Sequence, residues 1–171
     1  DFCLSRGLGD VYKRQPADID LLLPDAPEGP LPVQIITSGP DNGLQAIYRA
    51  HLAAINAAEE RVWLTTPYFV PTEAALAALT NASLRGVDVQ LLVPRRSDSA
   101  LVTAAARSYY DELIRCGVRV YEYKARMLHS KTLVVDDNIA IIGTANFDYR
   151  SFFLNYCLLY TSDAADEEDS V

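Results

Sequence analysis

Short apolar runs alternate with longer segments of helical period along the middle of the chain. The runs at 33–38, 61–69, 87–94 and 118–123 have the length and the β-branched or aromatic content of strands. Between them, apolar residues recur at helical spacing from 44 to 58, 73 to 85 and 97 to 116. Strands that alternate with helices predict an α/β fold, with a mixed, mostly parallel sheet and helices on both faces.

Punctuation along the chain supports these boundaries. Thr72 is a predicted helix cap with Glu73 in the first turn, and Ser97 or Ser99 can cap the next helix. Gly86 and Gly117 are predicted to end those two helices. Two further strands, "KTLVVD" and "IAIIGT", are joined by "DN", which is a tight-turn signal. The fold is therefore expected to end in a β-hairpin.

The two ends of the chain look foreign to it. The tail "CLLYTSDAADEE" and the segment "DVYKRQ" near the start can be encoded by opposite strands of one oligonucleotide. That oligonucleotide resembles a transposase-type sequencing adapter, so residues 1–15 and 157–171 are interpreted as adapter-derived. Residues 16–32 are Pro-rich and predicted to be a linker, which leaves 33–156 as the folded domain. Both ends are expected to pack poorly, although the apolar "CLLY" could complete a strand.

Excluding those ends changes the charge and the cysteine count. The whole chain has a formal net charge of −8 at pH 7, and the central segment only about −4. That weak acidity, without a basic run, does not favour a nucleic-acid partner. One cysteine, Cys116, remains in the centre, so no disulfide framework is expected. No apolar run is long enough to span a bilayer.

Candidate chemistry gathers at the predicted hairpin. His129 and Lys131 are two residues apart, so in a strand they point to the same face. The returning strand ends near Thr144 and Asn146, which could come back beside them. An imidazole, a fixed cation, an amide and a hydroxyl suit a phosphoryl group, since His can attack phosphorus and the others can bind its oxygens. This inventory does not favour a metal site, and no cofactor is expected.

For an isolated H-x-K pair, a histidine at the core edge and a surface lysine would be the better interpretation. The full string is more specific: H-x-K-x-x-x-x-D, six residues, then G-T-x-N. It resembles the HKD motif of the phospholipase D superfamily, whose members cleave or transfer phosphodiesters through a covalent phosphohistidine without metal. The family usually has Ser at the position of Thr144. The resemblance implies that His129, Lys131 and Asp136 form the catalytic set, with Asp136 supporting the motif, and that Lys131, Thr144 and Asn146 bind the phosphate.

Longer strings narrow the resemblance. "TPYFVP", "RGVDVQLLVPRRSD", "GVRVYEYKARMLHSKTLVVDD" and "GTANFDYRSFFLNY" are similar to the C-terminal half of bacterial cardiolipin synthases. The resemblance implies transfer of a phosphatidyl group between two phosphatidylglycerol molecules, with release of glycerol, at the cytoplasmic side of the plasma membrane. It also implies an upstream half with a second motif and membrane helices, which this chain lacks. In the family, "LNY" is followed by a Glu that can orient the motif histidine; here Cys157 stands there.

Other interpretations remain open. A different phosphodiesterase of the superfamily, such as a phospholipase or nuclease, would use the same motif. The chain could also fold and be inactive alone, because its partner histidine would lie on the missing half or on a second copy. His51 has no lysine at the motif spacing and is predicted to be a surface residue of its helix.

Overall fold

The structure is a computed structural model that describes residues 33–41, 43–125 and 128–163. Its strands are β1 (Val33–Ser38), β2 (Arg61–Thr65), β3 (Phe69–Val70), β4 (Asp88–Pro94), β5 (Arg119–Tyr123), β6 (Thr132–Val135), β7 (Ile139–Gly143), β8 (Phe147–Asp148) and β9 (Cys157–Asp163). Its helices are α2 (Ala46–Ala57), α3 (Glu73–Leu84), α4 (Ala100–Ser108), α5 (Tyr110–Arg115) and α6 (Tyr149–Phe153). The predicted strands and helices are thus present, whereas β3, β8 and α6 were not predicted.

The main sheet has seven strands in the order β1-β9-β7-β6-β2-β4-β5. In this sheet the pairs β2–β4 and β4–β5 are parallel, and the pairs β2–β6, β6–β7, β7–β9 and β9–β1 are antiparallel. The prediction of a mixed α/β sheet is confirmed, but the prediction that it is mostly parallel is wrong. Each βαβ unit adds one parallel pair, while the hairpin and the two strands beyond it are joined antiparallel.

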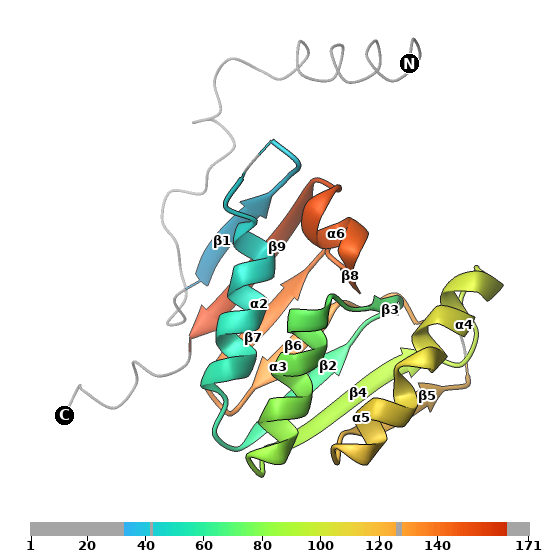
Figure 1. Ribbon diagram of the computed structural model, residues 1–171. Coiled ribbons are helices and arrows are strands. Elements are labelled where there is room, and N and C mark those ends of the chain that lie inside the picture. Colours follow the sequence, from blue (N-terminus) through green and yellow to red (C-terminus); the bar gives the residue numbers. More distant parts are fainter. Residues whose placement is uncertain (1–32, 42, 126–127, 164–171) are drawn as a thin grey trace, which may run out of the picture. The chain divides into compact units, whose positions relative to one another are not determined.

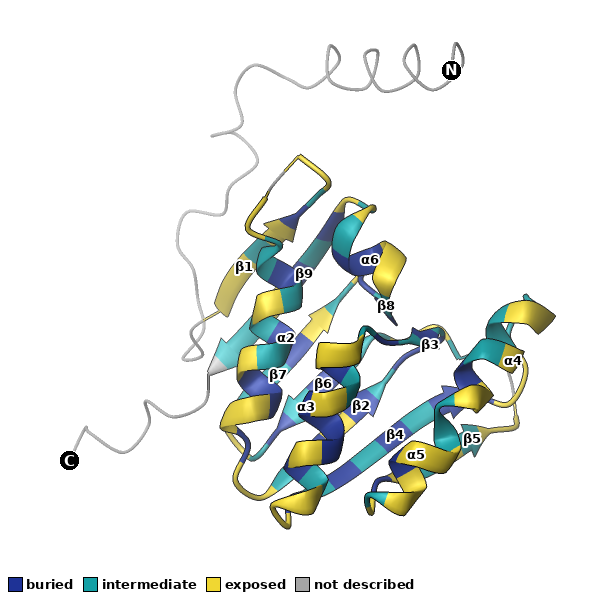
Figure 2. Cartoon of the chain, viewed as in Figure 1, coloured by how far each residue is buried: buried dark blue, intermediate teal, exposed yellow. Residues whose placement is uncertain are grey.

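One face of the sheet carries all the described helices (Figure 1). Residues that point to this face are buried, including Val62, Leu91, Leu133, Ile141 and Leu159. In the described part of the chain the opposite face is open: Trp63, Tyr121, Ile142 and Tyr160 are all exposed. Figure 2 shows exposed and buried positions side by side along the strands. The expected cover of helices on both faces is therefore wrong for the described part of the chain. A largely antiparallel sheet can leave one face to solvent, and the expectation came from a rule for parallel sheets.

The predicted helix boundaries are confirmed by their caps. Thr72 accepts a hydrogen bond from the Ala75 N–H at 3.2 Å, and Ser99 accepts one from the Val102 N–H at 3.4 Å. Gly86 and Gly117 both have positive φ just past their helices, at 98° and 94°. This is the left-handed conformation that glycine adopts without steric cost. The segment after Ser99 is two helices, α4 and α5, which meet at Tyr109.

The C-terminal segment contains a strand of the main sheet, β9. It lies between β1 and β7 and pairs with both, and Cys157 and Leu159 are buried in the core. The expectation that 157–171 packs poorly is wrong for 157–163, where the noted exception for "CLLY" applies. The packed domain accordingly continues past residue 156. The predicted linker at 16–32 and the segment 1–15 lie outside the described residues. No helix in the described ranges is long and apolar enough to cross a bilayer.

Candidate active site

His129 and Lys131 lie at one edge of the sheet, where β6 begins. Lys131 precedes β6 and extends its ladder, because its carbonyl accepts a hydrogen bond from the Gly143 N–H at 3.2 Å. Lys131 therefore lies one residue before the strand, which was predicted to start with it, and His129 lies in the segment that leads to the strand. The Lys131 ammonium turns back and donates to the His129 carbonyl at 2.7 Å. The two residues are thus held together, with the His129 side chain exposed.

Lys131 also lines a small hollow of about 10 Å³ beneath this edge. Thr66, Ala145, Phe147 and His51 are among the other residues around it. Burial lowers the pKa of the Lys131 ammonium, while the nearby Cys157 acts in the opposite direction. A partly desolvated cation interacts more strongly with an anion than one in bulk water, because the effective dielectric constant is lower.

The segment that carries Asn146 is fixed at the same edge. The Phe147 N–H donates to the Thr66 hydroxyl at 3.1 Å, and the Asn146 N–H donates to the Ser151 hydroxyl at 3.0 Å. The Asn146 amide oxygen is buried and accepts no hydrogen bond from any described residue. Buried polar atoms are rarely left without a hydrogen bond in folded proteins, so this oxygen is an exception in the segment.

Thr144 binds the start of β9, where Cys157 is the first residue. The Thr144 hydroxyl accepts from the Leu158 N–H at 2.9 Å, and the Thr144 N–H donates to the Leu158 carbonyl at 2.9 Å. A side chain at Gly143 would approach the same Leu158 carbonyl to 2.5 Å, so only glycine allows β9 this close. Burial raises the pKa of the Cys157 thiol, while a hydrogen bond with Thr144 and the charge of Lys131 act to lower it. Position 157 therefore belongs to the site.

Asp136 lies at the far end of β6 from Lys131. Five residues of extended chain separate the two positions by about 16 Å. Its carboxylate accepts hydrogen bonds from the N–H groups of Glu59, Glu60 and Arg61 at 3.1, 2.8 and 2.9 Å. Burial alone would raise its pKa, but these three N–H groups and the Arg61 charge lower it below the usual value. In this geometry Asp136 fixes the hairpin to the start of β2.

His51 is a site-adjacent residue that the sequence interpretation misplaced. It is buried, not on the helix surface, and its Nδ1–H donates to the Ile47 carbonyl at 2.8 Å. Its ring centroid is 6.0 Å from that of Phe147, and it lines the hollow with Lys131. The signal was present in the sequence: His51 shares a helix face with Ile47 and Ile55, at four-residue spacing.

The side chains gathered at this edge of the sheet limit the chemistry that the site can perform. The described residues contain no cluster of three or more His, Cys, Asp and Glu side chains that could hold a metal ion. They do bring a cation, an exposed imidazole and a hydroxyl to one edge, with an unpaired amide oxygen in the same chain segment. The ammonium and the hydroxyl can bind an oxyanion and the imidazole can act as a nucleophile, which is the chemistry of phosphoryl transfer.

Solved structures identify the fold. The chain aligns with Nuc, a phospholipase D family member from Salmonella typhimurium, at a TM-score of 0.64 and 22% identity, over 78% of this chain and 83% of that one. It also aligns with the phosphatidylserine synthase of Haemophilus influenzae at a TM-score of 0.62 and 16% identity, over 84% of this chain and 36% of that one. The protein therefore has a phospholipase D-like fold.

Sequence comparison gives the family. The family model described as "Cardiolipin synthase, PLD-like domain" matches residues 51–167. A cardiolipin synthase of Geobacillus thermodenitrificans is 46% identical over 82% of this chain, and cardiolipin synthase A of Pseudomonas fluorescens is 49% identical over 85%. The chain belongs to the cardiolipin synthase family. It spans 28% and 31% of the length of these two relatives.

Proposed function

We propose that this chain supplies one catalytic half of a cardiolipin synthase, with His129 and Lys131 at its centre. The observation that carries the proposal is the direct contact between the Lys131 ammonium and the His129 backbone at an open edge of the sheet. This contact keeps a cation beside an exposed imidazole. In a chain of the cardiolipin synthase family, the corresponding substrate is the phosphodiester of an anionic phospholipid such as phosphatidylglycerol.

The proposed reaction has two steps. An imidazole nitrogen of His129 attacks phosphorus, the bond from phosphorus to the glycerol headgroup oxygen breaks, and that oxygen leaves with a proton as glycerol. A hydroxyl of a second phosphatidylglycerol then attacks the phosphohistidine, the phosphorus–nitrogen bond breaks, and the hydroxyl proton is removed by a base. The products are cardiolipin and the free histidine. One of the two histidines, His129 or that of the partner half, attacks phosphorus. The other donates the proton to the leaving glycerol oxygen in the first step and removes the proton of the incoming hydroxyl in the second.

The other site residues have separate roles in this proposal. Lys131 neutralises charge on the phosphate oxygens, and the Asn146 amide and Thr144 hydroxyl provide neutral contacts. Asp136 acts through the hairpin, as a positioning residue. A Glu at position 157 would orient an imidazole by accepting its N–H, and the Cys157 thiol provides no such acceptor of comparable strength. The Cys157→Glu variant is accordingly expected to be more active than the present sequence.

A single motif provides a single histidine, so the proposal includes a second half. That half is either an upstream domain of a longer protein or a second copy of this chain. The substrate lies in a bilayer, so the working protein acts at a membrane surface, and the family resemblance favours the cytoplasmic side of the bacterial plasma membrane. The 171-residue chain is expected to show no turnover alone unless two copies pair.

The test uses the full-length synthase that contains this segment, with phosphatidylglycerol vesicles as substrate. His129→Ala is expected to abolish cardiolipin formation, a loss of about 10⁴-fold or more, since a general acid or base alone contributes about 10²- to 10⁴-fold. Lys131→Ala should be nearly as damaging, and Asn146→Ala less so, because a neutral donor contributes less than a cation. Arg115→Gln, an exposed change on α5, is the matched control and should retain activity.

Product analysis and acid quenching decide between the alternatives. Mass spectrometry of the quenched enzyme should find a phosphatidyl adduct on a motif histidine. Phosphatidic acid in place of cardiolipin would indicate a phospholipase, and cleavage of DNA would indicate a nuclease. Full activity of His129→Ala would overturn the catalytic assignment.

A further inference from the structure

A basic cavity lies beside the motif edge, in the loop between β4 and α4. The cavity has a volume of about 770 Å³ and is lined by three arginines, Arg95, Arg96 and Arg107, together with Ser97, Thr103 and Asp98. That volume falls within the usual range of about 300–1,000 Å³ for sites that hold small organic ligands. In a chain with a net charge of −8, such a concentration of arginine is a local reversal of the overall charge.

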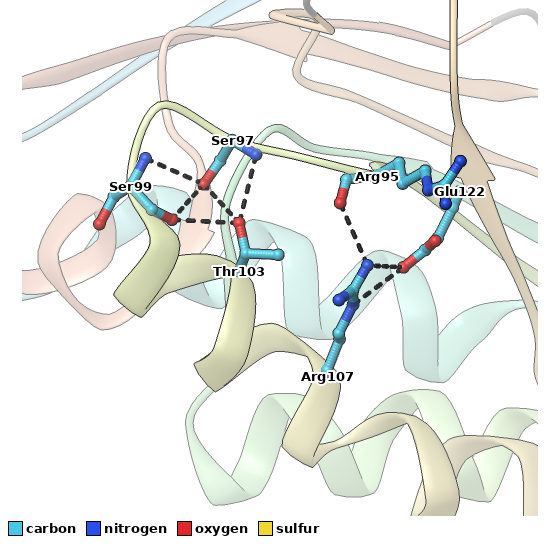
Figure 3. Close-up of polar contacts among 6 residues, drawn as sticks. All are labelled: Arg95, Ser97, Ser99, Thr103, Arg107 and Glu122. Atoms are coloured by element: carbon cyan, nitrogen blue, oxygen red, sulfur yellow. Dashed lines mark hydrogen bonds and ion pairs between the residues drawn. The ribbon is translucent and has the colours of Figure 1, made fainter.

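The wall of the cavity is held by a network of hydrogen bonds. The Ser97 and Thr103 hydroxyls are 2.9 Å apart, and both donate to the Ser99 carbonyl, at 2.7 and 3.0 Å (Figure 3). Arg107 donates to Glu122 through Nε and Nη2 at 3.1 and 2.9 Å, and to the Arg95 carbonyl at 3.2 Å. Arg107 therefore fixes the loop, and Glu122 balances its charge.

Arg95 and Arg96 differ from Arg107 in that their guanidinium groups have no partners in the part of the chain that the structure describes. Both are exposed, and among the described residues neither guanidinium forms a hydrogen bond or an ion pair. The carboxylate of Asp98, which also lines the cavity, accepts a hydrogen bond from the Tyr68 hydroxyl at 2.5 Å. Arg95 and Arg96 thus both line the cavity, and neither guanidinium has a partner within the described ranges. Guanidinium pairs preferentially with phosphate and carboxylate, through two parallel hydrogen bonds.

The position of the cavity relates it to the candidate active site. The Thr66 N–H, at the end of β2, donates to the Leu92 carbonyl of β4 at 3.1 Å, and Thr65 pairs with Thr132 of β6. The carboxyl ends of β2 and β4 and the start of β6 therefore share one edge. Lys131 and the cavity loop are two strand spacings apart across the sheet, or about 10 Å. The bond between Tyr68 and Asp98 joins the β2 end to the cavity loop.

We propose that Arg95 and Arg96 bind the phosphate of a second anionic phospholipid headgroup, beside the phosphate held at Lys131. This inference rests on the proposed function, because transfer between two phospholipids requires an acceptor that carries its own phosphate. The motif residues provide for one phosphate only. The cavity holds the second headgroup on the same edge, so that its glycerol hydroxyl can reach the phosphohistidine.

The test measures binding, which does not depend on turnover. The 171-residue chain is mixed with phosphatidylcholine vesicles that contain phosphatidylglycerol, and the bound fraction is measured by cosedimentation. The Arg95→Gln/Arg96→Gln variant is expected to bind about thirtyfold more weakly, because each of the two basic residues near an anionic surface contributes about 1 kcal/mol. The matched control is Arg115→Gln/Arg119→Gln, which removes the same charge at the opposite end of the sheet and should change binding less than twofold. Equal losses in the two variants would overturn the proposal.

Soluble probes separate a headgroup site from a simple anion site. Glycerophosphoglycerol, the deacylated headgroup, should shift the Nε–Hε NMR signals of Arg95 and Arg96 with saturation, at concentrations well below those needed for inorganic phosphate. Equal affinity for both probes, or no shift with either, would overturn the headgroup assignment. His129→Asn should leave this binding unchanged, even if cardiolipin synthesis fails. A failure of the proposed function and a failure of the arginine site are therefore distinguishable.

Discussion

The parallel and antiparallel halves of the sheet are stabilised in different ways. The parallel half, β2, β4 and β5, is built from consecutive βαβ units with α3, α4 and α5 between the strands. The antiparallel half consists of β6, β7, β9 and β1, and Lys131 and Thr144 lie directly beside the ends of β6 and β7. Its order joins the first described strand to the last. The half that carries the motif therefore depends on contacts between distant parts of the chain, which form at a greater cost in chain entropy.

Removal of β9 should destabilise the antiparallel half far more than the parallel half, and this is the largest effect that we expect. A chain that ends at Tyr156 loses the strand that joins β1 to β7, together with the buried Leu159. Loss of one fully buried leucine alone costs about 2–5 kcal/mol, which is a large part of the 5–15 kcal/mol stability of a typical domain. Hydrogen exchange should show protection lost in β1, β6 and β7 and kept in β4 and β5. Uniform protection in the shortened chain would contradict this view of β9.

Two neighbouring isoleucines of β7 allow the stability contributions of the covered and the open face of the sheet to be compared. Ile141 is 3% exposed and Ile142 is 58% exposed, on opposite sides of the sheet. Ile141→Ala should lower the free energy of unfolding by about 2–5 kcal/mol, because it leaves a cavity in the core. Ile142→Ala should change it by about 0.5 kcal/mol or less. Urea denaturation gives both values, and a large loss for Ile142→Ala would indicate that the open face is covered in solution, for instance by a second copy.

Asp136 connects the two halves through its bonds to the chain before β2. Asp136→Ala leaves three N–H groups without their acceptor, and we expect a loss of about 1–3 kcal/mol. The carboxylate has a lowered pKa in the folded protein, so its contribution is complete above the unfolded value near pH 4 and declines as the pH falls through the folded value. The difference in stability between wild type and variant, measured by denaturation at pH 7 and pH 3, should shrink at pH 3. A constant difference would contradict a role for the ionised form.

His51 should give the smallest of these effects. Burial lowers its pKa, against a smaller opposing contribution from the bond to the Ile47 carbonyl. A neutral buried histidine contributes stability above its unfolded pKa near 6.5, and that stability declines as the pH falls toward the folded value. The thermal midpoint of wild type should therefore fall between pH 7 and pH 5 more than that of His51→Leu. Parallel curves for the two proteins would place His51 in a solvated environment.

Local signals in the sequence determined much of the fold and part of the site. Period and capping residues predicted the main helices and strands, because Thr72, Ser99, Gly86 and Gly117 act on their immediate neighbours. The motif string predicted His129 and Lys131 as site residues, since their chemistry and spacing are both local. The prediction for His51 failed although its helical period placed it on the apolar face.

Tertiary structure alone decided how these elements combine. Strand direction is not encoded in a strand's own hydrophobic pattern, so the antiparallel half could not be recognised from alternation of strands and helices. The acceptance of 157–163 as a central strand depends on free edges of β1 and β7, which exist only after the rest has folded. The position of the Arg95 loop relative to Lys131 has the same origin, because the order β6-β2-β4 sets the distance between these strand ends.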